Sequence, residues 1–97
     1  MIRELILGVL SQGESHGYAI AEVLRGHGFA RIKGGTLYPL LKRLEDQGFV
    51  MHVWQHEQAG PGRKQFTLTD RGREELGRST AAWQRMTQAL SDIRTSR

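Results

Sequence analysis

The side chains best suited to chemistry in this chain are a phenol, an ammonium and a guanidinium, which lie close together at Tyr38, Lys42 and Arg43. The same stretch holds four leucines spaced i, i+3, i+4 and i+7, which places them on one stripe of a helix: Leu37, Leu40, Leu41 and Leu44. The polar side chains then lie on the opposite face, where they can bind phosphates or, for Arg43, the edge of guanine. This pattern predicts a helix that reads DNA, and a plain amphipathic helix with a solvated face is the alternative.

Glycines mark the two ends of this reading helix. We expect it to begin near Gly35 or Thr36 and to end before Gly48. Pro39 must lie close to the start, because a proline deeper in a helix removes a backbone hydrogen bond and clashes with the preceding turn. Lys33 and Thr36 are then near the N-terminal end, where free N–H groups attract phosphate, so both join the candidate DNA contacts.

After the reading helix the pattern changes from helical to extended. Residues 49–56 are rich in Val, Met, Trp and Phe, and residues 63–69 place two apolar side chains two apart. Residues 58–62 are a turn by composition, which predicts a β-hairpin. Arg63 and Lys64 follow that turn and can straddle phosphates at the hairpin tip, or alternatively keep an edge strand soluble.

Two further helices are expected before the reading helix. Residues 1–10 carry apolar side chains at helical spacing, and Ser15 can cap a second helix that ends at the glycines near 26. We expect that second helix to bury three side chains, Ile20, Val23 and Leu24. The order of three helices, a hairpin and a last helix predicts a mainly α fold, a winged helix-turn-helix over residues 1–69.

The last helix, over residues 70–97, follows Thr69, whose hydroxyl can cap it. Along it Leu76, Trp83 and Leu90 recur every seven residues, and Ser79, Met86 and Ile93 lie three after each. A stripe of this kind at the end of a small domain favours a partner, and a second copy of the chain is the expected one. With Leu5 and Val9 of the first helix, the apolar residues of the stripe are the predicted dimer contacts.

Composition narrows the classes of function. The net charge is +4, and no acidic residue lies between Val23 and Leu44, which makes the reading helix locally positive. There is no cysteine, and His52 and His56 are too far apart on a strand to chelate together, so we expect neither metal nor cofactor. No nucleophile, base and acid set indicates an enzyme. No window approaches the roughly 18 apolar residues of a membrane span and no signal peptide is evident, which predicts a cytoplasmic protein.

Three motifs, taken with their spacing, resemble the PadR family of transcriptional regulators. They are His16-Gly17-Tyr18, then Gly35-Thr36-Leu37-Tyr38-Pro39 with Leu41 to Glu45 and Gly48, then Gly60-Pro61-Gly62-Arg63-Lys64 with Leu68-Thr69-x-x-Gly72. Gln65 departs from the family, which usually has an aromatic residue there. The resemblance implies a homodimeric repressor that releases DNA when a small molecule binds, and the chain is similar to a shorter subgroup with one C-terminal helix. We interpret His16 and Tyr18 as structural, with Tyr18 packed between helices.

The homodimer that this resemblance implies predicts what the protein binds: an operator and a small effector. Its two reading helices would address successive major grooves, so the operator is expected to be an inverted repeat with half-site centres about 34 Å apart. Trp83 and its neighbour Met86 can line a cleft that stacks on a flat aromatic effector, and simple interface packing is the alternative. The rival function is a winged-helix module that binds protein without DNA, and the salt dependence of DNA binding discriminates between the two.

Overall fold

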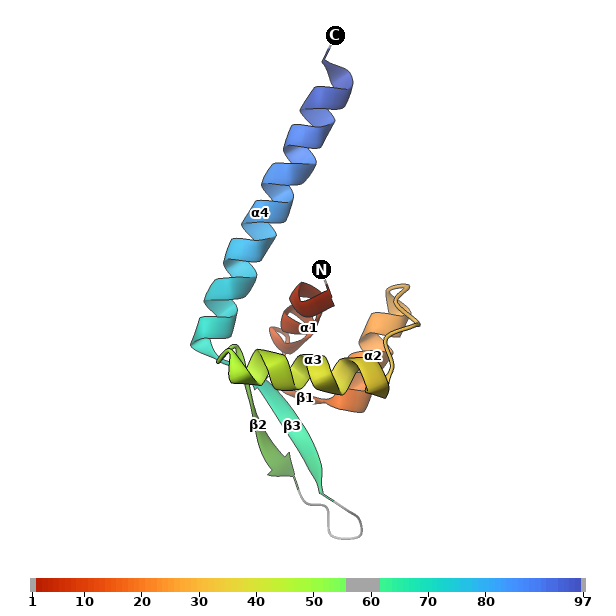
Figure 1. Cartoon of the computed structure of the whole chain (residues 1–97), viewed down its shortest axis with the longest axis vertical. Coiled ribbons are helices and arrows are strands. Elements are labelled where there is room, and N and C mark those ends of the chain that lie inside the picture. Colours follow the sequence, from red (N-terminus) through yellow and green to blue (C-terminus); the bar gives the residue numbers. More distant parts are fainter. Residues whose placement is uncertain (1, 56–61, 97) are drawn as a thin grey trace.

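The protein is described by a computed structural model over residues 2–55 and 62–96, and Figure 1 shows its arrangement. Its elements are α1 (Ile2–Leu10), β1 (Ser15–His16), α2 (Gly17–Gly26), α3 (Gly34–Asp46), β2 (Val50–Gln55), β3 (Arg63–Leu68) and α4 (Asp70–Thr95). The predicted fold class is confirmed: helices dominate, and α3 lies across the base of a hairpin that points away from α4 (Figure 1). No helix in the described part of the chain is long and apolar enough to cross a membrane.

A two-residue strand, β1, is the element that sequence patterns missed. It pairs antiparallel with β3, Ser15 opposite Phe66 and His16 opposite Gln65, which gives a sheet in the order β1-β3-β2. The prediction that Ser15 caps α2 was therefore wrong, because Ser15 belongs to this strand. The cap is His16, whose Nδ1 accepts a hydrogen bond from the Ala19 N–H at 3.3 Å.

The core lies where α1, α2 and α3 meet the base of the sheet. It is formed by apolar side chains from all of these elements, among them Ile6, Leu10, Ile20, Leu24, Leu37, Leu41, Leu44, Val50 and Phe66. The leucine stripe of α3 is confirmed, with Leu40 only partly buried. Val23, predicted to be buried, is 43% exposed, because the inward stripe of α2 runs through Gly17, Ile20 and Leu24 and leaves Val23 on a flank.

The reading helix α3 starts at Gly34, slightly earlier than expected, with Lys33 at the N-cap. Pro39 therefore lies inside the helix, in its second turn rather than at its first residues. The backbone bond that its missing N–H would make is to the carbonyl of Gly35, in the first turn. The loss is thus confined to the N-terminal end of the helix, which continues to Asp46.

Helix α4 is anchored at its first turn and then leaves the rest of the molecule. The predicted cap is confirmed: the Thr69 hydroxyl accepts from the Gly72 N–H at 3.0 Å and donates to the Gly48 carbonyl at 2.6 Å. Gly72 is the buried residue of this helix of 26 residues. The radius of gyration, 16.0 Å, exceeds the roughly 13 Å of a compact chain of this size because α4 projects outward (Figure 1).

Candidate nucleic-acid interface

The face of α3 that looks toward the hairpin brings together three of the predicted DNA contacts. Tyr38 and Lys42 of α3 and Lys64 of β3 line one hollow of about 510 Å³. Lys42 Nζ lies 3.6 Å from Asp46 Oδ1, but its side chain is 77% exposed, so this pair is weak and can open to a phosphate. The Lys64 ammonium lies 5.8 Å from the centre of the Trp54 ring, which holds it against the sheet.

A polar contact between side chains links α3 to the hairpin. His52 Nδ1 of β2 lies 2.5 Å from Glu45 Oε2 of α3. The His52 ring also meets Trp54 edge-on at 6.4 Å and Phe66 at 5.9 Å between ring centres. His52 thus contacts both α3 and the β2–β3 hairpin, which is the wing of the fold. Among the described residues no three His, Cys, Asp or Glu side chains could hold a metal ion, and His56 lies outside those residues.

Arg43 and Thr36 lie on a different flank of α3 from Tyr38 and Lys42. Adjacent helical residues point about 100° apart, whereas residues seven apart share a face. Arg43 and Thr36 therefore line a separate groove between α3 and the start of α1, together with Ile2, Arg3, Phe29, Gly35, Pro39, Leu40, Leu44 and Gln47. The sequence pattern had placed Arg43 beside Lys42 on one face, and the structure separates them.

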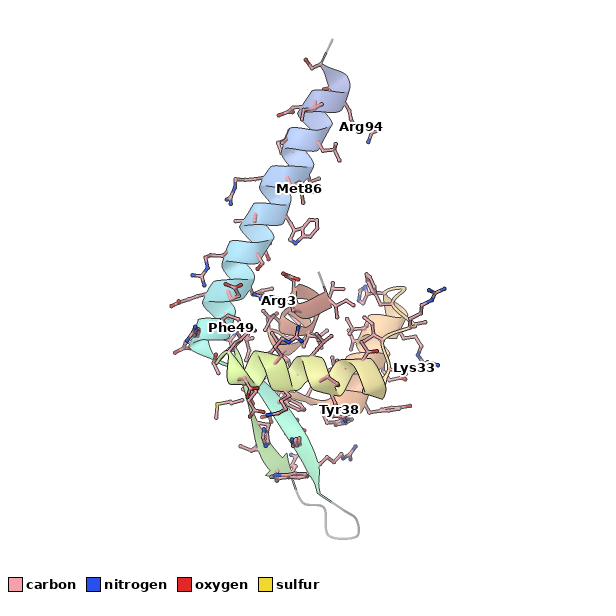
Figure 2. The ribbon with its side chains drawn as sticks, in the orientation of Figure 1. Arg3, Lys33, Tyr38, Phe49, Met86 and Arg94 are labelled. Carbon is pink, nitrogen blue, oxygen red and sulfur yellow. The ribbon has the colours of Figure 1, made fainter. Side chains whose placement is uncertain are left out.

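Lys33 and Tyr38 both lie at the end of α3 next to α2 (Figure 2). A Cβ on Gly17 would come within 2.4 Å of the Tyr38 hydroxyl, so this phenol lies directly over the first turn of α2 while remaining half exposed. Lys33 lines a shallow hollow with Tyr18 and Arg25. The prediction that Tyr18 packs between helices was wrong: it is 69% exposed, and Tyr38 makes the contact with α2 instead.

Arg63, the first residue of β3, lies at the turn end of the hairpin, opposite Gln55 of β2. Its Nη1 lies 3.4 Å from the Nε2 atom of His16. His16 was interpreted as structural, and its cap on α2 confirms that part of its role. Sequence patterns gave no signal for this neighbour, because the contact depends on the pairing of β1 with β3.

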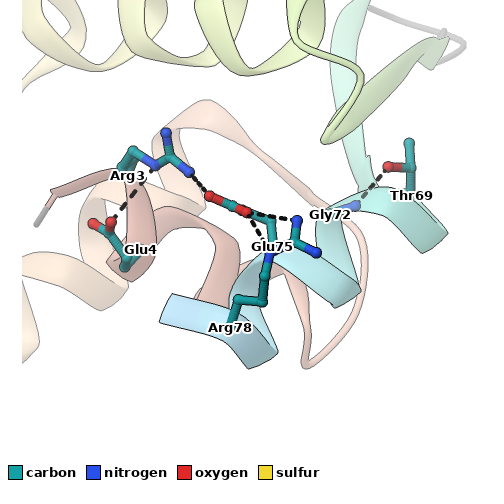
Figure 3. Close-up of polar contacts among 6 residues, drawn as sticks. All are labelled: Arg3, Glu4, Thr69, Gly72, Glu75 and Arg78. Atoms are coloured by element: carbon teal, nitrogen blue, oxygen red, sulfur yellow. Dashed lines mark hydrogen bonds and ion pairs between the residues drawn. The ribbon is translucent and has the colours of Figure 1, made fainter. Parts of the chain in front are cut away.

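A cluster of charged side chains links the base of α4 to α1 (Figure 3). Arg3 pairs with Glu75, and Arg78 donates to the same carboxylate at 2.8 Å. The guanidinium groups of Arg3 and Arg71 lie over the Phe49 ring at 5.4 and 5.5 Å from its centre. The hydrogen bond from Arg78, helped by the charge of Arg3, lowers the pKa of Glu75 below its ordinary value despite the opposing effect of burial.

Beyond this base, the predicted stripe of α4 is exposed. Leu76 packs against the core, whereas Trp83, Met86, Leu90 and Ile93 are 42, 53, 54 and 70% exposed. Leu5, Leu76 and Trp83 line one groove of about 650 Å³ between α1 and α4. Val9 is partly buried against the core. Met86 does not line this groove and lies farther along α4 (Figure 2).

Comparison with known proteins identifies relatives over most of the chain. The model of the transcriptional regulator PadR-like family matches residues 6–78. The chain is 35% identical over 78 residues to the negative transcriptional regulator PadR of Bacillus subtilis, covering 78% of this chain and 43% of that protein. It is 36% identical over 75 residues to the transcriptional regulator Rv3488 of Mycobacterium tuberculosis, covering 77% of this chain and 68% of that protein. The match thus spans less than half of the Bacillus subtilis protein.

Solved structures extend the likeness to the full arrangement of elements. A PadR-like transcriptional regulator from Bacillus cereus superposes with a TM-score of 0.86 at 28% identity, covering 99% of this chain and 93% of that one. Bacillus subtilis PadR in complex with operator DNA superposes with a TM-score of 0.75 at 32% identity, covering 82% of this chain and 46% of that one.

Proposed function

The chain belongs to the PadR-like family of transcriptional regulators, and from this premise we propose that it is a homodimeric repressor that binds an inverted-repeat operator and is released by a small aromatic molecule. The family and the relatives are transcriptional regulators rather than enzymes. A cytoplasmic location is part of the same proposal, because the protein would act on DNA there.

The observation that carries DNA binding is the shared face of α3 and the wing. Tyr38, Lys42 and Lys64 come from two elements and converge on one hollow, and the Lys42 side chain is exposed enough to reach phosphate oxygens. In this arrangement α3 enters the major groove and the hairpin follows the backbone. We assign Lys42 and Lys64 to phosphates and the hydroxyl of Tyr38 to a phosphate beside α2. We assign Thr36 and Arg43 to the other side of the DNA major groove, and Lys33 to the DNA next to the N-terminus of α3.

The dimer follows from the exposed stripe of α4. Trp83, Leu90 and Ile93 are large apolar side chains on a helix that leaves its own domain, and a helix exposing such residues gains stability when a second helix covers them. Leu5 borders the same groove, so a second copy of α4 would cover α1 and α4 together. The two reading helices would then face the same side of the DNA.

An effector would act through this interface. Trp83 lines the groove between α1 and α4, and a second copy would bring another Trp83 to the same region. A flat aromatic molecule stacked there, with Met86 adjusting nearby, would change the angle between the two α4 helices. It would release DNA only by binding the free dimer more tightly than the DNA-bound dimer. An effector bound equally by both would contradict this mechanism.

The test is selection of DNA from a randomised pool by the purified protein at near-physiological salt, followed by sequencing. The expected result is an inverted repeat with half-site centres about 34 Å apart. Recovery of no motif, with only weak salt-sensitive binding, would contradict a sequence-specific repressor. It would favour the rival function, a winged-helix module that binds protein.

Salt dependence on the selected site tests the named residues. Lys42→Gln should lower the slope of log affinity against log salt by about 0.9, the value of one lost phosphate contact. Arg85→Gln makes the same change of charge on α4 and serves as the matched control, with an unchanged slope expected. Equal slopes for both variants and the wild type would remove Lys42 from the interface.

A further inference from the structure

Lys64 and Trp54 face each other across the two strands of the wing. They are directly opposite in the pairing of β2 with β3. The Lys64 ammonium lies 5.8 Å from the centre of the Trp54 ring, within the range in which the electron-rich face of an indole attracts a cation. A lysine ammonium is otherwise carried on a flexible stem of four carbons. The ring therefore restricts the positions that this ammonium takes.

The Trp54 ring is itself oriented by contacts that reach the reading helix. His52 lies two residues earlier on β2, on the same face of the strand. Its ring meets the Trp54 ring edge-on, with 6.4 Å between ring centres, an arrangement that aromatic rings favour. His52 Nδ1 lies 2.5 Å from Glu45 Oε2 of α3. A chain of three contacts thus connects α3, through β2, to the Lys64 ammonium on β3.

This chain of contacts leaves Lys64 available to the hollow beside α3. Lys64 lines that hollow together with Tyr38 and Lys42, whereas Trp54 does not line it. The ring therefore meets the ammonium from outside the hollow. An ammonium has three N–H donors, and the face of a ring occupies one side of it. The remaining donors can reach a phosphate oxygen in the hollow while the cation stays over the ring.

We propose that Trp54 is a positioning residue for DNA binding: its ring holds the Lys64 ammonium beside the hollow in the free protein, and Lys64 keeps this contact when it binds a backbone phosphate. The role rests on the proposed DNA-binding function and on the assignment of Lys64 to phosphate. Side-chain freedom that is already restricted in the free protein is not lost again on binding, so the ring raises affinity. Because the contact is to phosphate, the gain is the same for operator and mixed-sequence DNA.

Two variants of Trp54 test the need for a ring. Trp54→Leu removes the ring and keeps an apolar side chain, whereas Trp54→Phe keeps a ring face. We expect Trp54→Leu to bind operator and mixed-sequence duplexes about two- to fivefold more weakly than wild type, the effect of one exposed cation–π interaction. Trp54→Phe should recover part of this loss. If folded Trp54→Phe bound as weakly as Trp54→Leu, the ring would have no role in holding Lys64.

Salt dependence separates positioning of Lys64 from general support of the wing. Trp54→Leu should keep the wild-type slope of log affinity against log salt, because Lys64 still reaches its phosphate. Lys64→Gln should lower that slope by about 0.9, the value of one lost phosphate contact. A lowered slope for Trp54→Leu would mean that the wing had lost its phosphate contact, which would overturn the positioning role.

A double-mutant cycle tests whether the ring acts through Lys64. In the Lys64→Gln background, Trp54→Leu should cause no measurable further loss of affinity, because the cation that the ring holds is gone. Lys42→Gln is the matched background: Lys42 lines the same hollow from α3 and pairs with Asp46. There the full loss should remain. Equal losses in the two backgrounds would show that Trp54 contacts DNA itself and would overturn the positioning role.

Nuclear magnetic resonance tests the contact without DNA. Protons over the face of an aromatic ring resonate upfield, so the ε-methylene protons of Lys64 should lie upfield in the wild type relative to Trp54→Leu, and should remain there when a duplex is bound. Loss of the upfield position on binding would overturn the proposal. Wild-type protein that binds no duplex would overturn the proposed function and this role together. Wild-type protein that binds DNA while folded Trp54→Leu binds equally well would overturn only the role of Trp54.

Discussion

Gly72→Ala tests how closely α4 is packed on the rest of the protein. A Cβ at this position would lie 2.1 Å from the carbonyl oxygen of Phe49 and 2.6 Å from Leu68 Cδ1. The oxygen is a backbone atom and already accepts a hydrogen bond from the Thr69 N–H at 3.1 Å. Because a carbon approaches a carbonyl oxygen to about 3.3 Å at best, the first turn of α4 must move by roughly 1 Å.

The energetic effect is the sum of three contributions. Overpacking of a close contact costs about 1–3 kcal/mol, and weakening of the bond between Thr69 and Phe49 costs about 0.5–1.5 kcal/mol more. Alanine offsets up to about 1 kcal/mol of this because it favours a helix more than glycine does. We therefore expect Gly72→Ala to lower the free energy of unfolding by about 0.5–4.5 kcal/mol.

Urea unfolding at one fixed protein concentration measures this change, and Gly77→Ala is its matched control. Gly77 is in the same helix, and a Cβ there would meet nothing within 4 Å beyond its chain neighbours and the backbone of its own helix. Alanine there should raise the free energy of unfolding by up to about 1 kcal/mol. If Gly72→Ala were as stable as the wild type or as Gly77→Ala, the close packing of α4 on Phe49 would be refuted.

Three further predictions address the interface, the dimer and the base of α4. Gly17→Ala should displace the Tyr38 hydroxyl, which would lie 2.4 Å from the new Cβ, and weaken DNA binding about fivefold with little change in the urea midpoint. Leu90→Asp should weaken dimerisation by at least about tenfold in sedimentation, because a carboxylate would be buried without a partner, and an unchanged dimer would remove Leu90 from the interface. The lowered pKa of Glu75 means that its carboxylate stabilises the fold above its ordinary pKa of 4.5 and loses that effect as the pH falls through the lowered pKa, so the difference in urea midpoint between wild type and Glu75→Gln should shrink in acid.

The reading helix could be predicted from the sequence because its signal is local. Four leucines at helical spacing define one face, and the glycines define the ends. The structure confirms the helix and buries Leu37, Leu41 and Leu44. The assignment of side chains to the DNA face was less secure, since a step of one residue turns the helix by about 100° and moves Arg43 to the groove beside α1.

The strand β1 could not be predicted because its cause is distant in the sequence. Two residues carry no periodicity, and their conformation depends on hydrogen bonds to Phe66 and Gln65 of β3. The same strand moves the cap from Ser15 to His16 and brings His16 to Arg63. Because this strand was missed, neither the correct cap nor the contact between His16 and Arg63 could be predicted.

The buried face of α2 was predicted incorrectly because one of its buried residues is a glycine. Its buried stripe includes Gly17, which has no side chain to reveal its burial and is needed because the Tyr38 hydroxyl occupies the space that a Cβ would fill. Counting apolar side chains alone therefore shifted the predicted stripe toward Val23. Val23 is in fact exposed.

The two ends of the α4 stripe have different partners. Leu76 packs on the core of its own chain, whereas the core leaves the stripe exposed from Trp83 onward. The same seven-residue spacing therefore stabilises the fold at the base of α4 and offers an apolar surface to a partner farther along the helix. The direction in which α4 leaves the domain is fixed by contacts at its first turns, the Gly72 packing and the charges around Phe49. In a dimer those same contacts would set the separation of the two reading helices. Substitutions at the base of α4 should therefore alter the preferred spacing of half-sites without touching DNA.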